Sequence, residues 1–308
     1  MQALVALRSA VRATLEKFAA GDVILVAVSG GADSLALAEV AKIEGDKLAL
    51  KIIGITIDHQ LQNGSDEQAK KVVSQISIPC LIEKIKVEIT DGLEASARRA
   101  RYVALEKCAK ENNAVAILLG HTKDDQAETV LLGLARGSGA RSLSGMSEVN
   151  GIYCRPFLEI TREQTVQACA ELKLEPWHDP HNDDESFLRV KVRKNVLPKM
   201  EQELGPGIRD ALSRSAQLLR DDADALDNLA KEFWDHDKSL AIEELTKLSK
   251  AVRTRVLRLA LFESGISQLS AEQVAQVEAL ISNWKGQGEV SLPSGVKVSR
   301  ISGRLTLS

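Results

Sequence analysis

The chain has 308 residues, of which 44% are hydrophobic and 27% charged, and its formal net charge is −3. This length accommodates two domains, and the composition is typical of a soluble globular protein. The slight acidity excludes nucleic-acid binding through overall charge, so any RNA contact needs local basic patches.

The predicted elements alternate between strand and helix along the first two thirds of the chain. Apolar runs predict buried strands at residues 24–28, 51–57, 81–87, 114–119 and 153–156. Helical spacing predicts helices at 2–18, from 35, at 65–77, at 93–111, from 121 to 136 and from 161. This order predicts an α/β fold with a doubly wound parallel sheet.

The regular alternation of strands and helices ends after Gly137, and Gly205-Pro-Gly207 is the candidate domain boundary. It separates a larger domain, residues 1–204, from a smaller domain, residues 205–308, that is mainly helical and ends in short strands. Since no apolar run approaches membrane-spanning length and no signal-peptide pattern opens the chain, we expect a cytoplasmic protein without a membrane partner. The four cysteines lack Cys-x-x-Cys spacing and are expected to be reduced thiols. The sequence does not decide whether the protein forms a homodimer.

The most specific stretch is Ser29-Gly-Gly-Ala-Asp-Ser34, between the first strand and the helix that follows it. Its glycines let the backbone approach a ligand, and free N–H groups at a helix start attract phosphate. Ser29 and Ser34 add hydroxyl donors, while Asp33 can hold a Mg²⁺ that neutralises a polyphosphate. No Gly-Lys-Ser/Thr is present, so this is not the P-loop built around a lysine. A ligand-free turn is the alternative, and the specificity of the motif argues against it.

A second motif, Gly120-His-Thr-Lys-Asp-Asp-Gln-Ala-Glu-Thr129, follows the strand at 114–119. On a helix, His121, Asp125 and Glu128 would share one face. Three interpretations are open: acids that complement the helix dipole, a divalent-metal site, or a pocket for a cationic substrate. A site is favoured because the helix starts where a strand ends, the edge at which such sheets bind ligands. Asp58 ends the strand at 51–57 at the same edge.

Basic residues gather in three segments. An exposed helix face explains Arg99, next to Arg98 and Arg101. The alternating basic residues of segment 189–194 fit either an ordinary exposed strand or loop, or an RNA contact. For Arg253, Arg255 and Arg258, which lie on a predicted helix, the two alternatives are an ordinary solvated helix surface and an RNA contact.

The first motif resembles the signature loop of the ATP pyrophosphatases, and together the motifs resemble those of the tRNA(Ile)-lysidine synthetases within that PP-loop superfamily. The resemblance covers about residues 20–200 and rests on motifs in the family's order: Ser29–Ser34, Asp58–Leu61, Glu94–Tyr102, His121–Thr129, Arg136–Gly139, Gly145-Met146, Arg155-Pro156 and Trp177–Pro198. The chain departs from the family pattern at Gln60, Gln62 and Val190.

This resemblance implies an adenine nucleotide alpha hydrolase-like fold and a ligase that forms a carbon–nitrogen bond. Such an enzyme uses ATP and Mg²⁺ to adenylate the wobble cytidine of the minor tRNA(Ile) with a CAU anticodon, releasing pyrophosphate. The amine of free L-lysine then displaces AMP and gives lysidine, which changes the codon read from AUG to AUA and the amino-acid identity from methionine to isoleucine.

Carried onto this sequence, the resemblance implies a role for each motif residue. ATP would be bound by Ser29, Gly30, Gly31, Ala32, Asp33, Ser34 and Asp58, with Asp33 also on the metal. Catalysis would involve Asp33, Arg101 and His121. Lysine would be bound by Asp125 and Glu128, and tRNA by Arg189, Lys191, Arg193 and Lys194. Residues 1–204 would then be the ATP-binding catalytic domain, and residues 205–308 a domain that contacts tRNA. Two alternatives remain. A tRNA-thiolating enzyme would require a cysteine pair, and a module that binds ATP without catalysing a reaction would not need a second substrate pocket.

Overall fold

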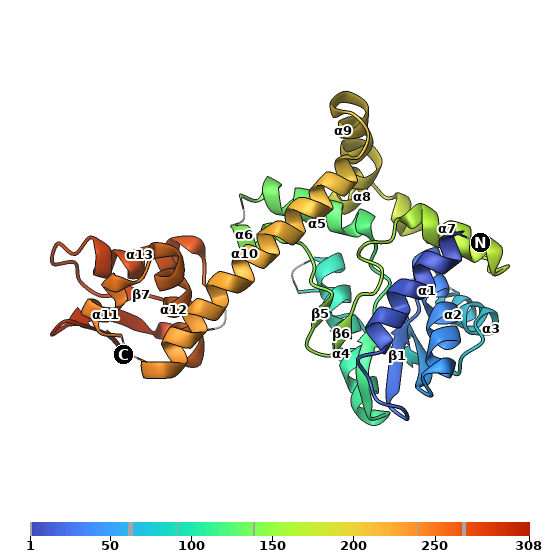
Figure 1. Ribbon diagram of the computed structural model, residues 1–308, viewed down its shortest axis with the longest axis horizontal. Helices are drawn as coiled ribbons and strands as arrows, with labels where there is room; N and C mark the ends of the chain where they lie inside the picture. Colours follow the sequence, from blue (N-terminus) through green and yellow to red (C-terminus); the bar gives the residue numbers. More distant parts are fainter. Residues whose placement is uncertain (1, 61–63, 91, 138, 239, 267–268) are drawn as a thin grey trace. The chain divides into compact units, whose positions relative to one another are not determined.

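The computed structural model describes residues 2–308 except 61–63, 91, 138, 239 and 267–268, so Leu61 and Gln62 of the motifs above lie outside the described residues (Figure 1). The chain forms two compact units, one extending to Gln217 and the other spanning Leu218–Ser308. This division falls inside the long helix α10 (Ile208–Asp237). The functional boundary placed at residue 205 stays a prediction.

The first unit is built on a six-stranded sheet in the order β3-β2-β1-β4-β6-β5. Its strands are β1 (Val23–Ala27), β2 (Lys51–Asp58), β3 (Cys80–Lys84), β4 (Ala114–Leu118), β5 (Val149–Asn150) and β6 (Tyr153–Cys154). Pairing is parallel from β3 to β6, and β5 is antiparallel to β6. The chain moves outward from β1 to β3 and then returns to the other side of β1 at β4. This confirms the doubly wound α/β fold and places its switch point between β1 and β4.

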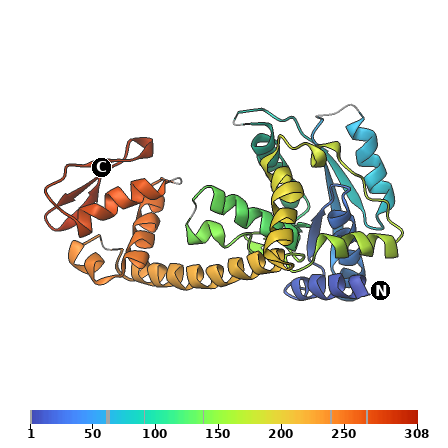
Figure 2. The ribbon, with the colours of Figure 1, turned by 90° about the horizontal axis from the view of Figure 1, so that it is seen from above.

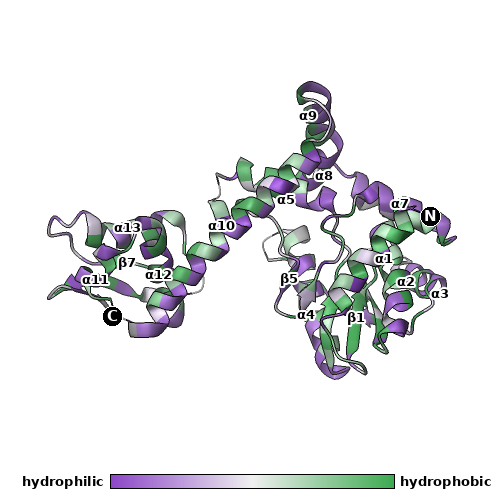
Figure 3. Ribbon diagram, viewed as in Figure 1, coloured by the Kyte–Doolittle hydropathy of each residue, from purple (hydrophilic) through white to green (hydrophobic). Residues whose placement is uncertain are grey.

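Helices cover both faces of this sheet (Figures 1 and 2). Ile24 and Val26 of β1 belong to one core with residues of α1 (Gln2–Leu15), α2 (Ala32–Lys47) and α7 (Arg162–Glu171). Leu25, between them, packs on the opposite face with Leu105 of α4 (Leu93–Glu111). Alternate residues of a strand point to opposite faces, so a strand covered on both sides must be apolar throughout, as β1 is in Figure 3.

The remaining helical segments of this unit are mostly short. They are α3 (Ser65–Gln75), α5 (Lys123–Ala135), α6 (Ala140–Leu143), a 3₁₀ turn (Pro180–Asp183), α8 (Leu188–Lys191), a π-helical turn (Val192–Val196) and α9 (Leu197–Leu204). Segment 189–194 is therefore helical, whereas the alternation of its basic residues had suggested a strand or loop. The reason is tertiary packing, because Val190 and Val192 are both buried in this conformation.

The second unit has its own core. The C-terminal part of α10 packs with α11 (Ile242–Lys247), α12 (Lys250–Glu263), α13 (Ala271–Ser282) and a three-stranded sheet of β7 (Val290–Ser291), β8 (Lys297–Ile301) and β9 (Arg304–Leu307). A short 3₁₀ turn, Pro293–Gly295, joins β7 to β8. The guanidinium of Arg253 forms a buried ion pair with Glu278 at 2.5 Å and donates to the Leu248 carbonyl, so this basic residue is used inside the fold. No described helix is both long and apolar enough to cross a membrane.

Glu44 fixes α1 to α2. Its carboxylate is 1% exposed and lies 2.6 Å from Arg8 Nε, 2.6 Å from Arg12 Nη2 and 3.0 Å from Lys47 Nζ. Burial raises the pKa of Glu44, but the hydrogen bonds from these three cations outweigh burial and lower it from 4.5 to about 2. The contribution of this carboxylate to stability is therefore complete above pH 4.5 and is lost as the pH falls toward 2.

We expect Glu44→Gln to lower the free energy of unfolding at pH 7 by about 1–2 kcal/mol, because the partners are partly exposed and solvent screens them. Denaturant unfolding at pH 7 and pH 3 measures this, and the difference between wild type and variant should shrink at the lower pH. Asp46→Asn on the same helix is the control, since Asp46 makes one exposed pair with Lys42. An equal loss in both variants would contradict the assignment.

Candidate functional site

The two main motifs meet at one edge of the sheet. Ser29–Ser34 follows β1, Gly120 follows β4, and Asp58 ends β2. A Cβ atom at Gly120 would lie 3.1 Å from both C and O of Asp33, so the two segments are in backbone contact there. Glycine is the residue that permits this approach. The structure therefore brings the two motifs together at the topological switch point, where α/β sheets bind ligands.

Hydrogen bonds fix the conformation of the loop after β1. Ser34 Oγ accepts from Ser29 N at 3.1 Å and donates to the Gly31 carbonyl at 3.0 Å. Gly30 has φ +89°, a conformation that favours glycine, and its carbonyl accepts from Trp177 N at 2.9 Å. Since α2 begins at Ala32, the first N–H groups of the helix have no acceptor within it. This arrangement suits a phosphate group.

Asp33 faces the start of α7. Thr165 Oγ1 donates to Asp33 Oδ1, and Arg162 Nε lies 3.6 Å from Asp33 Oδ2. Burial raises the pKa of Asp33 even though Arg162 and Thr165 act to lower it. Sequence reasoning missed both partners. A signal existed, because Arg162 and Thr165 are three residues apart in the first turn of a helix and so share a face.

The second motif forms a helix start. Asp125 Oδ2 accepts from Thr122 N at 2.8 Å and from Thr122 Oγ1 at 3.0 Å, which makes Thr122 the cap of α5. His121 therefore precedes the helix, and the expectation that it shares a helix face with Asp125 and Glu128 is wrong. The other oxygen of Asp125 lies 3.0 Å from Arg162 Nη2.

Glu128 lies at the centre of a cluster of charges. Its side chain is fully buried and pairs with Arg193, with Nε–Oε1 at 2.7 Å and Nη2–Oε2 at 3.2 Å. Arg162 and Arg189 each approach it to 3.6 Å. Three carboxylates, Asp33, Asp125 and Glu128, thus face three guanidiniums, those of Arg162, Arg189 and Arg193. Among the described residues no group of three or more His, Cys, Asp or Glu side chains is arranged to hold a metal ion.

The four basic residues predicted to contact RNA divide into two pairs. Arg189 and Arg193 point into the acid cluster, and Arg189 Nη2 also donates to Thr129 Oγ1 at 3.1 Å. Lys191 is exposed, and Lys194 is an exposed residue whose ammonium pairs with Asp183. One segment therefore presents cations both to the site and to solvent.

Three buried nitrogen atoms without hydrogen-bond partners border the site. The Nε atoms of Arg101 and Arg155 and the Nδ1 of His121 are buried and have no hydrogen-bond partner among the described residues. Burial, together with the nearby charges of Arg155, Arg101 and Arg98, lowers the pKa of His121 to about 3 against the opposing effect of Asp125. Burial likewise lowers the pKa of Arg101. Unpartnered donors near like charges are suited to an anion.

The depressed pKa of His121 has a consequence for stability. The unfolded chain takes up a proton near pH 6.5 that the folded chain does not take up until about pH 3, so stability falls as the pH drops through this window. We expect unfolding free energies at pH 7.5 and 5.5 to differ by about 1 kcal/mol more in wild type than in His121→Gln. Denaturant titrations at the two pH values measure this. A pH dependence identical in both proteins would show that His121 titrates normally.

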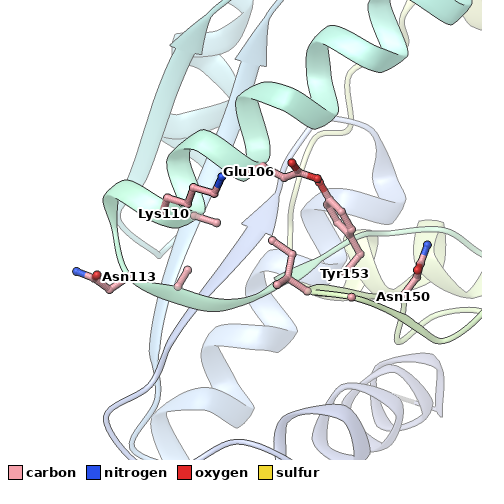
Figure 4. A pocket seen from close by; sticks show the side chains of 9 residues that line it. Glu106, Lys110, Asn113, Asn150 and Tyr153 are labelled. Atoms are coloured by element: carbon pink, nitrogen blue, oxygen red, sulfur yellow. The ribbon is translucent and has the colours of Figure 1, made fainter. Parts of the chain in front are cut away.

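A separate hollow lies away from these motifs. It is lined by Glu106, Lys110 and Asn113, by Ala114 at the start of β4, and by Asn150 and Tyr153 (Figure 4). Because β4 begins there and the motifs follow its other end, the hollow lies at the opposite edge of the sheet. Tyr153 Oη donates to Glu106 Oε1 at 3.0 Å across it. The motif residues do not line it.

Two family models together match most of the chain. Residues 5–200 match the PP-loop domain family, and residues 240–306 match the TilS substrate binding domain. The chain is 45% identical to the tRNA(Ile)-lysidine synthase of Thermobifida fusca over 311 residues, covering 98% of this chain and 96% of that protein. It is 48% identical to the enzyme of that name from Leifsonia xyli over 301 residues, covering 94% and 90%.

A solved structure supports the fold alone. The U34-tRNA thiolase NcsA from Methanococcus maripaludis, with its [4Fe-4S] cluster, superimposes with a TM-score of 0.57 at 18% identity, covering 70% of this chain and 78% of that one. Among the four free cysteines of this chain, Cys108, Cys154 and Cys169 are buried and Cys80 is partly buried. Burial raises the pKa of all four thiols.

Proposed function

Because the chain belongs to the tRNA(Ile)-lysidine synthase family, we propose that it ligates free L-lysine to C2 of the wobble cytidine of a tRNA(Ile) with a CAU anticodon. The C2 oxygen attacks the α-phosphorus of ATP and pyrophosphate leaves. The amine of lysine then attacks C2, and AMP leaves with the oxygen. The product, lysidine, changes the codon read from AUG to AUA and the identity of the tRNA from methionine to isoleucine.

The observation that carries the proposal is the contact between the Ser29–Ser34 loop and the start of the second motif at Gly120. This contact supports the proposal because the loop that would bind phosphate then lies beside a cluster of carboxylates, as a reaction that joins an activated nucleotide to a cation requires. Asp33 is the carboxylate that would bind Mg²⁺. One carboxylate together with ATP phosphates is a usual set of ligands for Mg²⁺, and the metal would neutralise the charge on the leaving pyrophosphate.

Asp58 fits the nucleotide as well. It is buried at the end of β2, its Oδ1 accepts from Gln60 N at 2.9 Å, and its Oδ2 has no partner among the described residues. A buried acceptor of this kind is costly unless a donor reaches it. A ribose hydroxyl of ATP would supply that donor.

His121 would gain a role only when ATP is bound. In the structure its pKa is about 3, first because it is buried and then because Arg155, Arg101 and Arg98 are close. A polyphosphate bound among these cations would offset their charge and raise the pKa of the histidine toward its usual value. His121 could then accept the proton that the lysine amine must lose, while Asp125 and Glu128 position the ammonium end.

The second unit is proposed to hold the tRNA, since residues 240–306 match a substrate binding domain. Its helix α12 carries Arg255, which pairs with Asp227 at 2.6 Å, and Arg258, which donates to the Leu269 carbonyl at 3.1 Å. Arg253 is excluded from this role because it is buried with Glu278. The basic segment 189–194 would supply a further RNA contact on the first unit.

Incubation of the protein with ATP, lysine and tRNA(Ile) transcript tests the proposal. We expect AMP, pyrophosphate and lysidine in equal amounts, with lysidine identified by mass spectrometry of the nucleosides. Without lysine, pyrophosphate and adenylated tRNA should form in one turnover. Incorporation of sulfur would favour the thiolating alternative, and ATP binding without turnover would favour a binding module.

A further inference from the structure

Glu128, a carboxylate proposed to bind the ammonium group of lysine, is already paired with an arginine. Glu128 is fully buried, and Arg193 pairs with both of its oxygens at 2.7 and 3.2 Å. Arg162 and Arg189 complete its surroundings at 3.6 Å each. A guanidinium therefore lies where the ammonium of a cationic substrate would have to bind.

The charges of this cluster are balanced without a substrate. Asp33, Asp125 and Glu128 face Arg162, Arg189 and Arg193, which are each 28% exposed at the side chain. An additional cation would leave a partly buried excess of positive charge, which is unfavourable where water is scarce. Entry of an ammonium group thus requires a guanidinium to leave.

Arg193 is the guanidinium whose surroundings best allow this. Arg162 is held by Asp125 at 3.0 Å, and its own backbone N–H donates to Asp124 at 2.8 Å, so α7 fixes it in place. Arg193 instead belongs to the π-helical turn Val192–Val196, an irregular helix geometry often found at functional sites. Its neighbours Lys191 and Lys194 are exposed, so an RNA phosphate drawn to this segment would come close to Arg193.

We propose that Arg193 occupies the ammonium site of Glu128 until RNA engages segment 189–194, so that lysine binding depends on bound tRNA. The inference rests on the proposed function and adds an order of binding to it. The RNA backbone takes over the guanidinium, and Glu128 is released for the substrate. By linkage, lysine strengthens tRNA binding by the same factor. The arrangement would also keep lysine from the site before a cytidine is present to receive it.

Equilibrium dialysis of radiolabelled lysine against the full-length protein, with and without the tRNA(Ile) transcript and without ATP, tests this order. In wild type we expect tRNA to lower the Kd for lysine by about tenfold or more, within the range usual for coupled sites. In Arg193→Gln, lysine should bind without tRNA about as well as it binds wild type with tRNA, and tRNA should change the Kd less than twofold.

Two further variants make the result specific. Arg193→Lys returns a cation to Glu128 and should restore most of the tRNA dependence, which also covers the case that the glutamine variant folds poorly. Lys199→Gln removes an exposed charge from the next helix, where Lys199 pairs with Glu203, and should leave the tRNA-free Kd for lysine unchanged. An AMPCPP arm, without tRNA, separates RNA from nucleotide as the agent, and an equal effect of AMPCPP alone would overturn the proposal.

Equal lysine affinity of wild type with and without tRNA would also overturn it, as would a coupling that survives in Arg193→Gln. These failures are distinct from failure of the proposed function. If wild type makes lysidine from ATP, lysine and tRNA but shows no coupling, only the order of binding is wrong. If it makes no lysidine, the proposed reaction itself is wrong.

Discussion

Asp33→Asn is expected to lower the rate of pyrophosphate release from ATP by roughly 10²–10³-fold, the usual effect of removing one group that stabilises charge in the transition state. The amide keeps the size of the side chain and an oxygen for the Thr165 hydroxyl, but it loses the charge proposed to bind Mg²⁺. Single-turnover assays with ATP and tRNA, without lysine, measure this step directly.

The fold should survive this substitution. Burial raises the pKa of Asp33, which means that the folded state disfavours its charge, so a neutral side chain is expected to leave stability unchanged or to increase it. Asp46→Asn, on the exposed face of the same helix, controls for loss of an acid from α2. Pyrophosphate release at the wild-type rate by a folded Asp33→Asn protein would remove Asp33 from the catalytic machinery.

Asp125→Asn is expected to raise the KM for lysine by about one to two decades, because a charge-assisted contact contributes roughly 1.5–3 kcal/mol. The amide oxygen can still accept from Thr122, so the start of α5 should persist, whereas the charge facing Arg162 is lost. Adenylation measured without lysine should change much less. Steady-state kinetics at varied lysine concentration gives both values.

Asp124→Asn is the matched control for this second substitution. Asp124 is the adjacent acid in the first turn, where it accepts from the Arg162 backbone N–H at 2.8 Å and lies 3.2 Å from Arg209 Nε. It has no predicted contact with lysine, and its loss should leave the KM for lysine within about twofold of wild type. An equal rise in both variants would mean that the helix start is disturbed and that the lysine assignment is wrong.

Much of the fold could be predicted because its signals are local. The five predicted strands are present with ends shifted by at most three residues, since an apolar run bounded by turns has few alternatives in an α/β protein. The edge of the sheet at which the motifs gather also followed from the sequence, because strands that run in parallel end on the same side.

The partners of the site residues could not be predicted in this way. Arg162 reaches Asp33 and Asp125, and Arg193 reaches Glu128 across 65 residues of chain. Nothing in local spacing says which arginine meets which acid, because those contacts depend on how α7 and the turn at Val192–Val196 pack on the sheet. The start of α5 was misplaced for a related reason, since the cap at Thr122 depends on the conformation of its side chain.

The hydrogen bond from Trp177 N to the Gly30 carbonyl gives the molecule an optical reporter. Of the three tryptophans, Trp177 is the one in the first unit, and Trp234 and Trp284 lie in the second. Trp177 is partly buried, and its Cβ lies 3.7 Å from the position that a Cβ on Gly30 would take. In a protein carrying Trp234→Phe and Trp284→Phe, the remaining indole emission would come from a residue bonded to the Ser29–Ser34 loop, so the proposed binding of nucleotide at this loop could be titrated without a label.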